Sequence, residues 1–237
     1  MRFFSKYRVK SKRARRSRLA RFVRWTVVVL AGLYAFCALV LVALRWVNPP
    51  FTAVQVQRRI ESYFSTRKYQ KRQIFVPLKT LPRDLQHAVI AAEDGRFYEH
   101  AGIDWQELQK VAKESLPEGR MARGASTISQ QLPKNLFLTT HRLAIRKALE
   151  YALVPLVELT LPKKRILELY LNVIEWGPGV YGVEAASRYH YGISAAKLNR
   201  DQAARLAACI PSPRLREPER MSTYSAIILD RMQKRGW

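Results

Sequence analysis

Residues 82–104 read PRDLQHAVIAAEDGRFYEHAGID, and this stretch indicates both the class of fold and the position of a reactive group. Proline is favourable in the first turn of a helix, so Pro82 can begin one. Leu85, Val89 and Glu93 then follow at i, i+4 and i+8, which places them on one helical face. The stretch therefore predicts a helix with a buried apolar stripe that ends in the carboxylate of Glu93.

A carboxylate at the end of an apolar stripe is half-buried, and burial disfavours its charged form. The pKa of the Glu93 carboxyl should therefore be raised, which suits a general base. We expect Gly95 to let the chain turn away and to leave Glu93 at the rim of a cleft. A capping or salt-bridged glutamate is the alternative, and position alone does not exclude it.

Helical periodicity continues through most of the chain. A second helix is predicted to begin near His141 and a third to follow Pro162. The best strand-like segment is QIFVPL, residues 73–78, so the predicted fold class is mainly α. The apolar residues at helical spacing are Leu143, Ile145, Leu149, Leu153 and Val157 in the second helix, and Ile166, Leu167, Tyr170, Leu171 and Ile174 on the buried side of the third.

The N-terminal part of the chain has the pattern of a membrane anchor. Residues 1–24 contain eleven Lys or Arg and no acid, and residues 25–44 carry no charge. About 20 helical residues span the ~30 Å hydrocarbon core of a bilayer. We therefore predict a basic cytoplasmic tail over 1–24, a single transmembrane helix over 25–45 and an extracytoplasmic domain over 46–237.

The distribution of charge supports this topology. Lys and Arg outnumber Asp and Glu 42 to 18, and an excess of cations before the span predicts a cytoplasmic N-terminus. A cleaved signal peptide is disfavoured because its apolar core is only about 7–15 residues long. The tail is interpreted as contacting anionic lipid, and nucleic-acid binding is not expected. Cys37 lies within the predicted transmembrane segment and Cys209 lies in the distal half of the chain, so we expect no disulfide between them.

Three familiar motifs lack the context that they need. GPGVYG at 177–182 matches a dinucleotide fingerprint, but a predicted helix precedes it where a strand is required. The S-x-x-K at 194–197 has no K-T-G or S-D-N partner, so acyl transfer is not indicated. The four histidines have no metal-ligand spacing, and we predict no metal site.

Two polar segments remain. RGASTISQQLPKNLFL, residues 123–138, is rich in hydroxyls and amides, and helical spacing places Ser126, Gln130 and Lys134 on one face. Pro133 should distort the turn there. Such a density of polar side chains predicts contact with a polar loop or ligand.

The second polar segment is HRLAIRKALE, residues 141–150, which places Arg142, Arg146 and Glu150 on one helical stripe. Guanidinium groups bind phosphate oxygens in a bidentate manner, so two arginines near Lys134 suit a diphosphate. One carboxylate among cations and another at an apolar rim is an arrangement suited to glycosyl transfer with an anionic leaving group.

Four segments together resemble the peptidoglycan glycosyltransferases. EDGRFYEHAGID, RGASTISQQLPKNLFL, RKALE with KKRILELYLN, and GPGVYGVEAASRYHYG occur in the order found in that family. The resemblance covers roughly residues 82–213 and looks closest to the monofunctional, membrane-anchored type of glycosyltransferase family 51. It implies a lysozyme-like, mostly helical domain.

The resemblance also implies roles for particular residues. Glu93 matches the general base, and Glu150 matches a glutamate that assists at the donor diphosphate. Pro133, Pro155 and Pro162 depart from the usual pattern and put local helix geometry in doubt. The remaining matches are Lys134, Arg142 and Arg146 as diphosphate ligands, Ser126, Gln131 and Asn135 as polar residues lining the same cleft, and Asp94 and His100 as supporting residues.

The implied reaction polymerises glycan strands from a lipid-linked disaccharide-peptide (lipid II), with inversion to β-1,4 bonds and release of polyprenyl diphosphate. No cofactor is obligatory, while a divalent cation (Mg²⁺ or Mn²⁺) at the diphosphate is left open. The expected partners are the growing glycan strand, membrane lipid and other proteins of cell-wall synthesis. Two alternatives stay open at this stage: a lysozyme-like lytic glycosidase, and a non-catalytic membrane-anchored scaffold.

Overall fold

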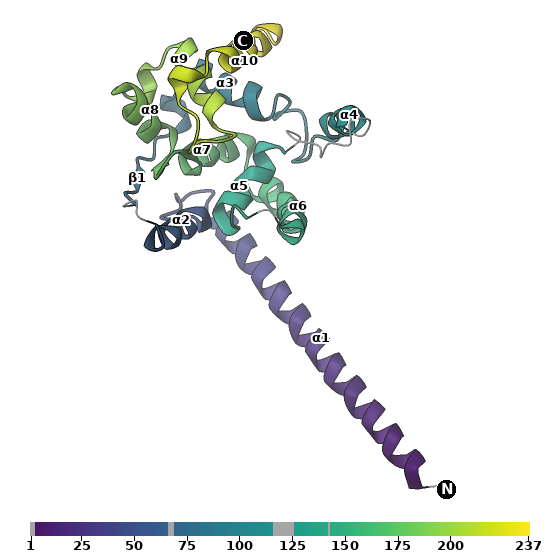
Figure 1. Cartoon of the computed structure of the whole chain (residues 1–237). Helices are drawn as coiled ribbons and strands as arrows, with labels where there is room; N and C mark the ends of the chain where they lie inside the picture. Colours follow the sequence, from purple (N-terminus) through teal and green to yellow (C-terminus); the bar gives the residue numbers. More distant parts are fainter. Residues whose placement is uncertain (1–2, 66–68, 116–125, 142) are drawn as a thin grey trace. The chain divides into compact units, whose positions relative to one another are not determined.

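The computed structural model describes residues 3–65, 69–115, 126–141 and 143–237. It divides into two compact units, Met1–Val40 and Leu41–Trp237. Helix α1 (Phe3–Ala43) makes up the described part of the first unit (Figure 1). Its segment Arg18–Ala43 is long and apolar enough to cross a membrane, which fits the predicted anchor.

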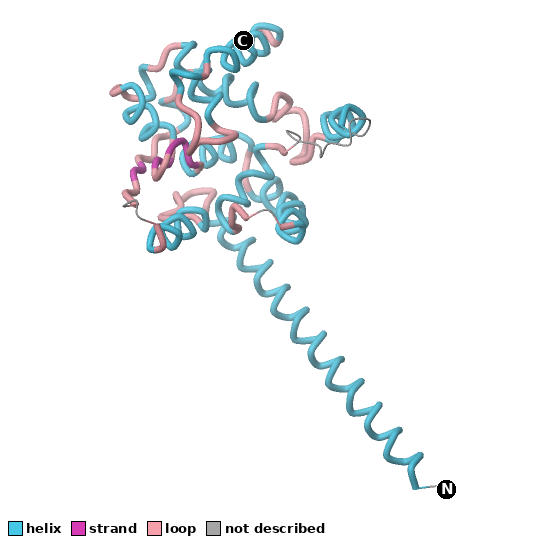
Figure 2. The backbone as a smooth tube through the Cα atoms, viewed as in Figure 1, coloured by secondary structure: helices cyan, strands magenta, loops and turns pink. Residues whose placement is uncertain are grey.

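The second unit is built mainly from helices, which confirms the predicted fold class (Figure 2). Three very short strands and three 3₁₀ turns complete it. The helices are α2 (Ala53–Tyr63), α3 (Arg83–Glu93), α4 (Trp105–Ser115), α5 (Ile128–Phe137), α6 (Ala144–Thr160), α7 (Lys163–Val173), α8 (Val183–Tyr191), α9 (Arg200–Cys209) and α10 (Ser222–Lys234). The strands are β1 (Arg72–Gln73), β2 (Glu175–Gly177) and β3 (Val180–Tyr181), and the 3₁₀ turns are η1 (Leu78–Thr80), η2 (Ala195–Lys197) and η3 (Pro218–Arg220).

Helix α3 follows the predicted pattern. It begins directly after Pro82, buries Leu85 and Val89 completely, and ends at Glu93. The chain turns at Gly95 as expected, and Glu93 lines a pocket, although the φ of this glycine is not positive. The chain leaves α3 at Asp94, where the backbone is extended, and tight turns follow it.

The predicted boundaries of the later elements needed correction. Helix α6 begins at Ala144 rather than near His141. Helix α7 does follow Pro162 and buries four of the five expected residues, but it ends at Val173. The fifth, Ile174, is buried just after the helix, and Glu175–Gly177 pair as β2. Only the first residue of the expected strand 73–78 belongs to β1, because the ladder is two residues long.

The glycine-rich segment 177–182 forms part of a small sheet in the order β1-β3-β2. Strand β3 pairs in parallel with β1 and antiparallel with β2. Gly179 and Gly182 both have positive φ, and a Cβ on Gly182 would lie 2.8 Å from the carbonyl oxygen of Asn172. The glycines therefore allow a tight turn against the end of α7, which accounts for them without a nucleotide.

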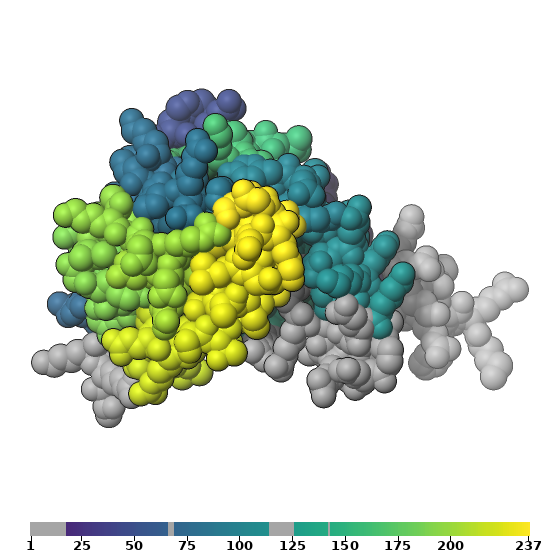
Figure 3. All heavy atoms as spheres, turned by 90° about the horizontal axis from the view of Figure 1, so that it is seen from above, coloured from purple at the N-terminus to yellow at the C-terminus, as the bar shows by residue number. Residues whose placement is uncertain are grey.

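The helices of the second unit pack in two groups. Helices α3, α9 and α10 pack on one another, and α5 packs against α6 and α7. Figure 1 shows the first group near the C-terminus, and Figure 3 shows α10 (yellow) on the surface beside residues near α4 (teal). The end of α3 is hydrogen-bonded to the beginning of α5, which brings Glu93 close to the polar segment on α5.

Candidate active site

Asp94 and His100 connect the end of α3 to the start of α5. One carboxylate oxygen of Asp94 accepts the backbone N–H of Ile128 at 3.0 Å, and the other lies 2.8 Å from Nε2 of His100. The N–H of Gly102 donates to Nδ1 of His100 at 3.1 Å. This places the ring proton on Nε2, so His100 donates to Asp94. The two residues predicted to support the cleft thus belong to one hydrogen-bonded network.

The first turn of α5 is fixed by a capping box. The hydroxyl of Thr127 accepts the N–H of Gln130, and the side chain of Gln130 accepts the N–H of Thr127 at 2.9 Å. The expected shared face holds for Gln130 and Lys134, which lie four residues apart in α5, but not for Ser126, which precedes the helix. The side chain of Gln130 is used in the cap. Gln131, its neighbour, is the residue that reaches Glu93.

The carboxylate of Glu93 is half-buried and held by one amide. Nε2 of Gln131 donates to Oε2 of Glu93 at 2.7 Å, and the hydroxyl of Tyr170 donates to Oε1 of Gln131 at 3.0 Å. Burial raises the pKa of Glu93, while the Gln131 hydrogen bond and the charge of Lys134 oppose the rise. Glu93 is therefore a carboxylate with increased proton affinity at the edge of a polar site.

Lys134 provides a cation close to this carboxylate. Its side chain is half-buried, and its ammonium group makes no hydrogen bond or ion pair with any residue that the structure describes. Burial lowers the pKa of Lys134, the charge of Glu93 opposes this, and Arg146 adds to the lowering. A desolvated ammonium without a partner is suited to an anionic ligand.

Glu150 is buried within a second cationic cluster. It forms ion pairs with Nη1 of Arg146 and with Nζ of Lys147, the latter at 3.0 Å. Lys147 also donates to the hydroxyl of Ser126 at 2.8 Å, which connects this cluster to the start of α5. Burial lowers the pKa of Lys147, and the charges of Lys134 and Arg146 lower it further. Two cations, Arg146 and Lys147, share the one carboxylate of Glu150, so the net charge of these three side chains is positive.

The remaining predicted residues have less direct positions. Asn135 donates from its side chain to the backbone oxygen of Gln131 at 2.8 Å, so it steadies the helix that carries Gln131. Arg142 lies outside the described residues.

Two residues that take part in the site were not predicted from the sequence. Lys147 could have been found from its spacing of three residues before Glu150. Tyr170 could have been found as the single hydroxyl on the buried side of its helix.

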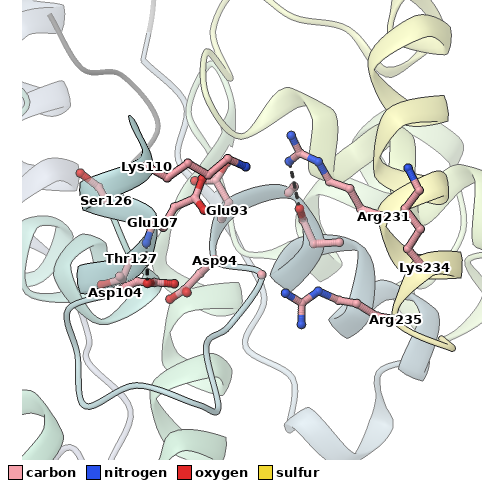
Figure 4. Close-up of a pocket in the computed structure, with 13 residues that line it drawn as sticks. Glu93, Asp94, Asp104, Glu107, Lys110, Ser126, Thr127, Arg231, Lys234 and Arg235 are labelled. Atoms are coloured by element: carbon pink, nitrogen blue, oxygen red, sulfur yellow. Dashed lines mark hydrogen bonds between the residues drawn. The ribbon is translucent and has the colours of Figure 1, made fainter. Parts of the chain in front are cut away.

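A pocket of about 440 Å³ opens beside Glu93 and is lined from α3, α4 and α10 (Figure 4). Near it, ligand atoms of Asp94, His100 and Asp104 lie within 4.8 Å of one another, a grouping that could hold a metal ion. The carboxylate of Asp104 is bound by Arg96 and by a backbone N–H, and Asp94 is used as described above. Hydrogen bonds within the protein thus account for this group.

Comparisons with known proteins agree with this arrangement. A family model described as Transglycosylase matches residues 59–233. The chain is 45% identical over 206 residues to a biosynthetic peptidoglycan transglycosylase of Ectopseudomonas mendocina, covering 87% of this chain and 85% of that one. It is 42% identical over 222 residues to the protein of the same name from Dechloromonas aromatica, covering 90% and 96%.

A third relative of the same name, from Thiobacillus denitrificans, is 45% identical over 201 residues and covers 81% of this chain. The chain therefore belongs to the transglycosylase family, the class of lysozyme-like glycosyltransferase domains that the resemblance implied. Within that class it groups with the biosynthetic peptidoglycan transglycosylases.

Proposed function

We propose that this protein polymerises peptidoglycan glycan strands from lipid II, the lipid-linked disaccharide-peptide. The proposal rests chiefly on one observation: Glu93 is hydrogen-bonded to Gln131 and feels the charge of Lys134, and Lys134 in turn lies near the cations Arg146 and Lys147 that pair with Glu150. A carboxylate with raised proton affinity can remove a proton, and fixed cations can stabilise an anion that departs. Both functions are needed when a sugar hydroxyl displaces a lipid diphosphate.

Glu93 acts as the general base in this reaction. It takes the proton from the 4-hydroxyl of the acceptor sugar as that oxygen attacks the anomeric carbon of the donor. The N–H donor of Gln131 orients the carboxylate and favours its charged form, while burial raises its affinity for the proton. General-base catalysis of this kind contributes about 10²–10⁴-fold to the rate.

The cations stabilise the leaving group. Lys134 and Arg146, together with Arg142 and Lys147, contact the oxygens of the departing polyprenyl diphosphate, where negative charge increases in the transition state. Glu150 holds Arg146 and Lys147 in position through its two carboxylate oxygens. The described donors do not fit a resident Mg²⁺ or Mn²⁺, because the one carboxylate in the cluster is already bound by two cations. No step is therefore assigned to a metal.

A single displacement inverts the configuration of the donor carbon. Two-step retention would require a second free carboxylate as nucleophile, close to the first. Glu150 is buried and paired with two cations, so it is unsuited to that role. An α-linked donor would thus give a β-1,4 bond.

The helix segment Arg18–Ala43 would anchor the enzyme in the inner membrane with the N-terminus in the cytoplasm. The catalytic unit would then act at the outer face, where both lipid-linked substrates remain in the bilayer. Residues 25–237 carry 31 basic and 18 acidic side chains, which favours diphosphates and anionic head groups. Other proteins of wall synthesis would be its partners.

The full chain in detergent should convert lipid II into long glycan polymer and free polyprenyl diphosphate. The same protein incubated with finished peptidoglycan should release nothing. Soluble muropeptides from the second incubation without polymer from the first would support the lytic alternative. Neither product, from a folded protein, would support the non-catalytic scaffold.

Lys134→Met tests the assignment of the leaving group. Removing one preorganised charge should lower kcat by about 10²–10³-fold. The effect on kcat should be at least as large as that on KM, because the charge acts mainly in the transition state. Lys197→Met, an exposed cation on η2, is the matched control and should leave both unchanged.

A further inference from the structure

The pocket beside Glu93 contains cations that the proposed reaction does not use. Arg231, Lys234 and Arg235 at the end of α10 line one side, and Lys110 on α4 lines the other (Figure 4). The leaving-group cations come instead from α5 and α6, on the side of Glu93 where Gln131 binds. The proposed catalytic base thus lines a pocket with one group of cations and also feels the charge of Lys134 from the other group.

The acidic residues of the pocket neutralise these cations only in part. Asp94 is occupied by His100 and a backbone N–H, and Asp104 is occupied by Arg96. Glu107 remains as one carboxylate on the α4 side of the pocket. The residues that line the pocket from the α10 side are all basic, and two of them pair with carboxylates outside the lining, Lys234 with Asp230 and Arg235 with Glu99 at 3.5 Å.

The cations themselves have weak partners among the residues that the structure describes. Arg231 donates to the backbone oxygen of Ala91 at 3.2 Å, and neither Arg231 nor Lys110 forms an ion pair with a described residue. Lys234 pairs with Asp230, but the two side chains are 73% and 54% exposed. Such exposed pairs are worth little and are easily replaced by a ligand.

Gly95 lies against one of these cations. Its backbone conformation does not require glycine, yet a Cβ at this position would lie 3.1 Å from Nη2 of Arg235. A side chain would thus crowd the guanidinium at the point where the chain leaves α3. The absence of a side chain leaves room for Arg235 two residues from Glu93.

We propose that Lys110, Arg231, Lys234 and Arg235 bind the carboxylates of the peptide carried by the acceptor disaccharide. The inference rests on the proposed function. Such a substrate carries its charge on a diphosphate and on peptide carboxylates, since the sugars are neutral. The α5–α6 cluster suits the compact diphosphate, whereas cations spread over two elements at an exposed rim suit an extended peptide.

Binding of a soluble disaccharide-peptide without lipid or phosphate tests this, using the full chain in detergent and calorimetry. The double variant Lys234→Gln/Arg235→Gln should bind it about fivefold to tenfold more weakly than wild type. Arg231 is left in place because it also contacts the end of α3. The matched control is Lys197→Gln/Arg220→Gln, two exposed cations away from the pocket, and should bind as wild type does.

Two further ligands separate the possible causes. A disaccharide-peptide with amidated carboxylates should bind weakly to wild type and equally weakly to the double variant. Inorganic pyrophosphate should bind wild type and the variant alike. Three results would each overturn the proposal. The double variant could lose affinity equally for the acid and the amidated ligand, or lose affinity only for pyrophosphate. Wild type could also bind the acid and amidated ligands equally well.

Turnover of lipid II is measured separately in the same preparations. Polymerisation without a preference for free carboxylates would reject the peptide site and leave the proposed function intact. A preference for free carboxylates without polymerisation would reject the proposed function and leave the peptide site intact.

Discussion

Tyr170 determines which way the amide of Gln131 points. Its hydroxyl donates to Oε1 of Gln131, which leaves Nε2 to donate to Glu93. Tyr170 is fully buried, so this hydroxyl has no water to replace its partner. The charged form of Glu93 is thus stabilised by a donor whose orientation is fixed from the other side.

Tyr170→Phe should shift the acid limb of the pH–rate profile to higher pH. The amide of Gln131 would be free to rotate, Glu93 would lose a dedicated donor, and its pKa would rise further. Since the base acts when deprotonated, polymerisation on the acid limb should fall about twofold to tenfold. The profile of kcat/KM against pH measures this. Tyr191→Phe, whose hydroxyl contacts Gln202, is the control, and an equal loss at every pH would contradict the positioning role.

Residues of the candidate site differ in how far the sequence alone identifies them. Glu93 could be predicted because the apolar stripe of its own helix leads to it. Gln131 came only from the family resemblance, since helical spacing favoured Gln130, which the capping box uses instead. Spacing cannot distinguish a side chain that turns back to its own helix from one that reaches across the site.

At the scale of elements, the first turn of α5 connects three parts of the structure. The hydroxyl of Thr127 accepts from Gln130 and donates to the backbone oxygen of Gly102 at 2.5 Å. Gly102 has a positive φ, and a Cβ on it would lie 2.3 Å from Val154 of α6. The loop after α3 is therefore held between α5 and α6 by close backbone contacts.

Thr127→Ala should lower both stability and activity. Loss of the cap should cost about 1–2 kcal/mol of unfolding free energy, and the displaced start of α5 should also disturb Glu93. Asn199→Ala removes the equivalent capping box of α9 and is the matched control. Its stability loss should be similar while kcat/KM stays near wild type. Equal activity losses in the two variants would show that stability alone is responsible.

The helices that the sequence predicted best begin after a proline and bury a regular stripe. Helices α3 and α7 follow Pro82 and Pro162 for this reason. The sheet was largely missed because strands of two or three residues carry no alternation to detect. The basic side of the pocket was also missed, since Arg231 reaches Ala91 only through the packing of α10 on α3.

At the scale of the whole molecule, the compact unit that carries the candidate site begins at Leu41. Leu41 and Leu44 are 0% and 4% exposed within the unit that starts at Leu41. Arg165 donates to the backbone oxygens of Leu44 and Val47. These contacts belong to the folded unit and would be lost if the chain began at Asn48.

Two truncated chains should therefore differ in stability. A chain beginning at Leu41 should unfold with the same midpoint as the full protein. A chain beginning at Asn48 should lose about 3–6 kcal/mol, because two leucines lose their burial. Chemical denaturation followed by circular dichroism measures both. Identical midpoints for the two truncated chains would show that residues 41–47 do not contribute to the fold.

Proton removal by Glu93 is the step on which the proposed reaction depends. Its direct test is the initial rate of lipid II polymerisation by Glu93→Gln, with thermal unfolding as a check on the fold. The amide keeps the size of the side chain and removes a buried charge, so the melting temperature should be equal to or above that of wild type. The rate should fall by about 10²–10⁴-fold. A folded variant that retains more than about a tenth of the wild-type rate would contradict the assignment of Glu93 as the base.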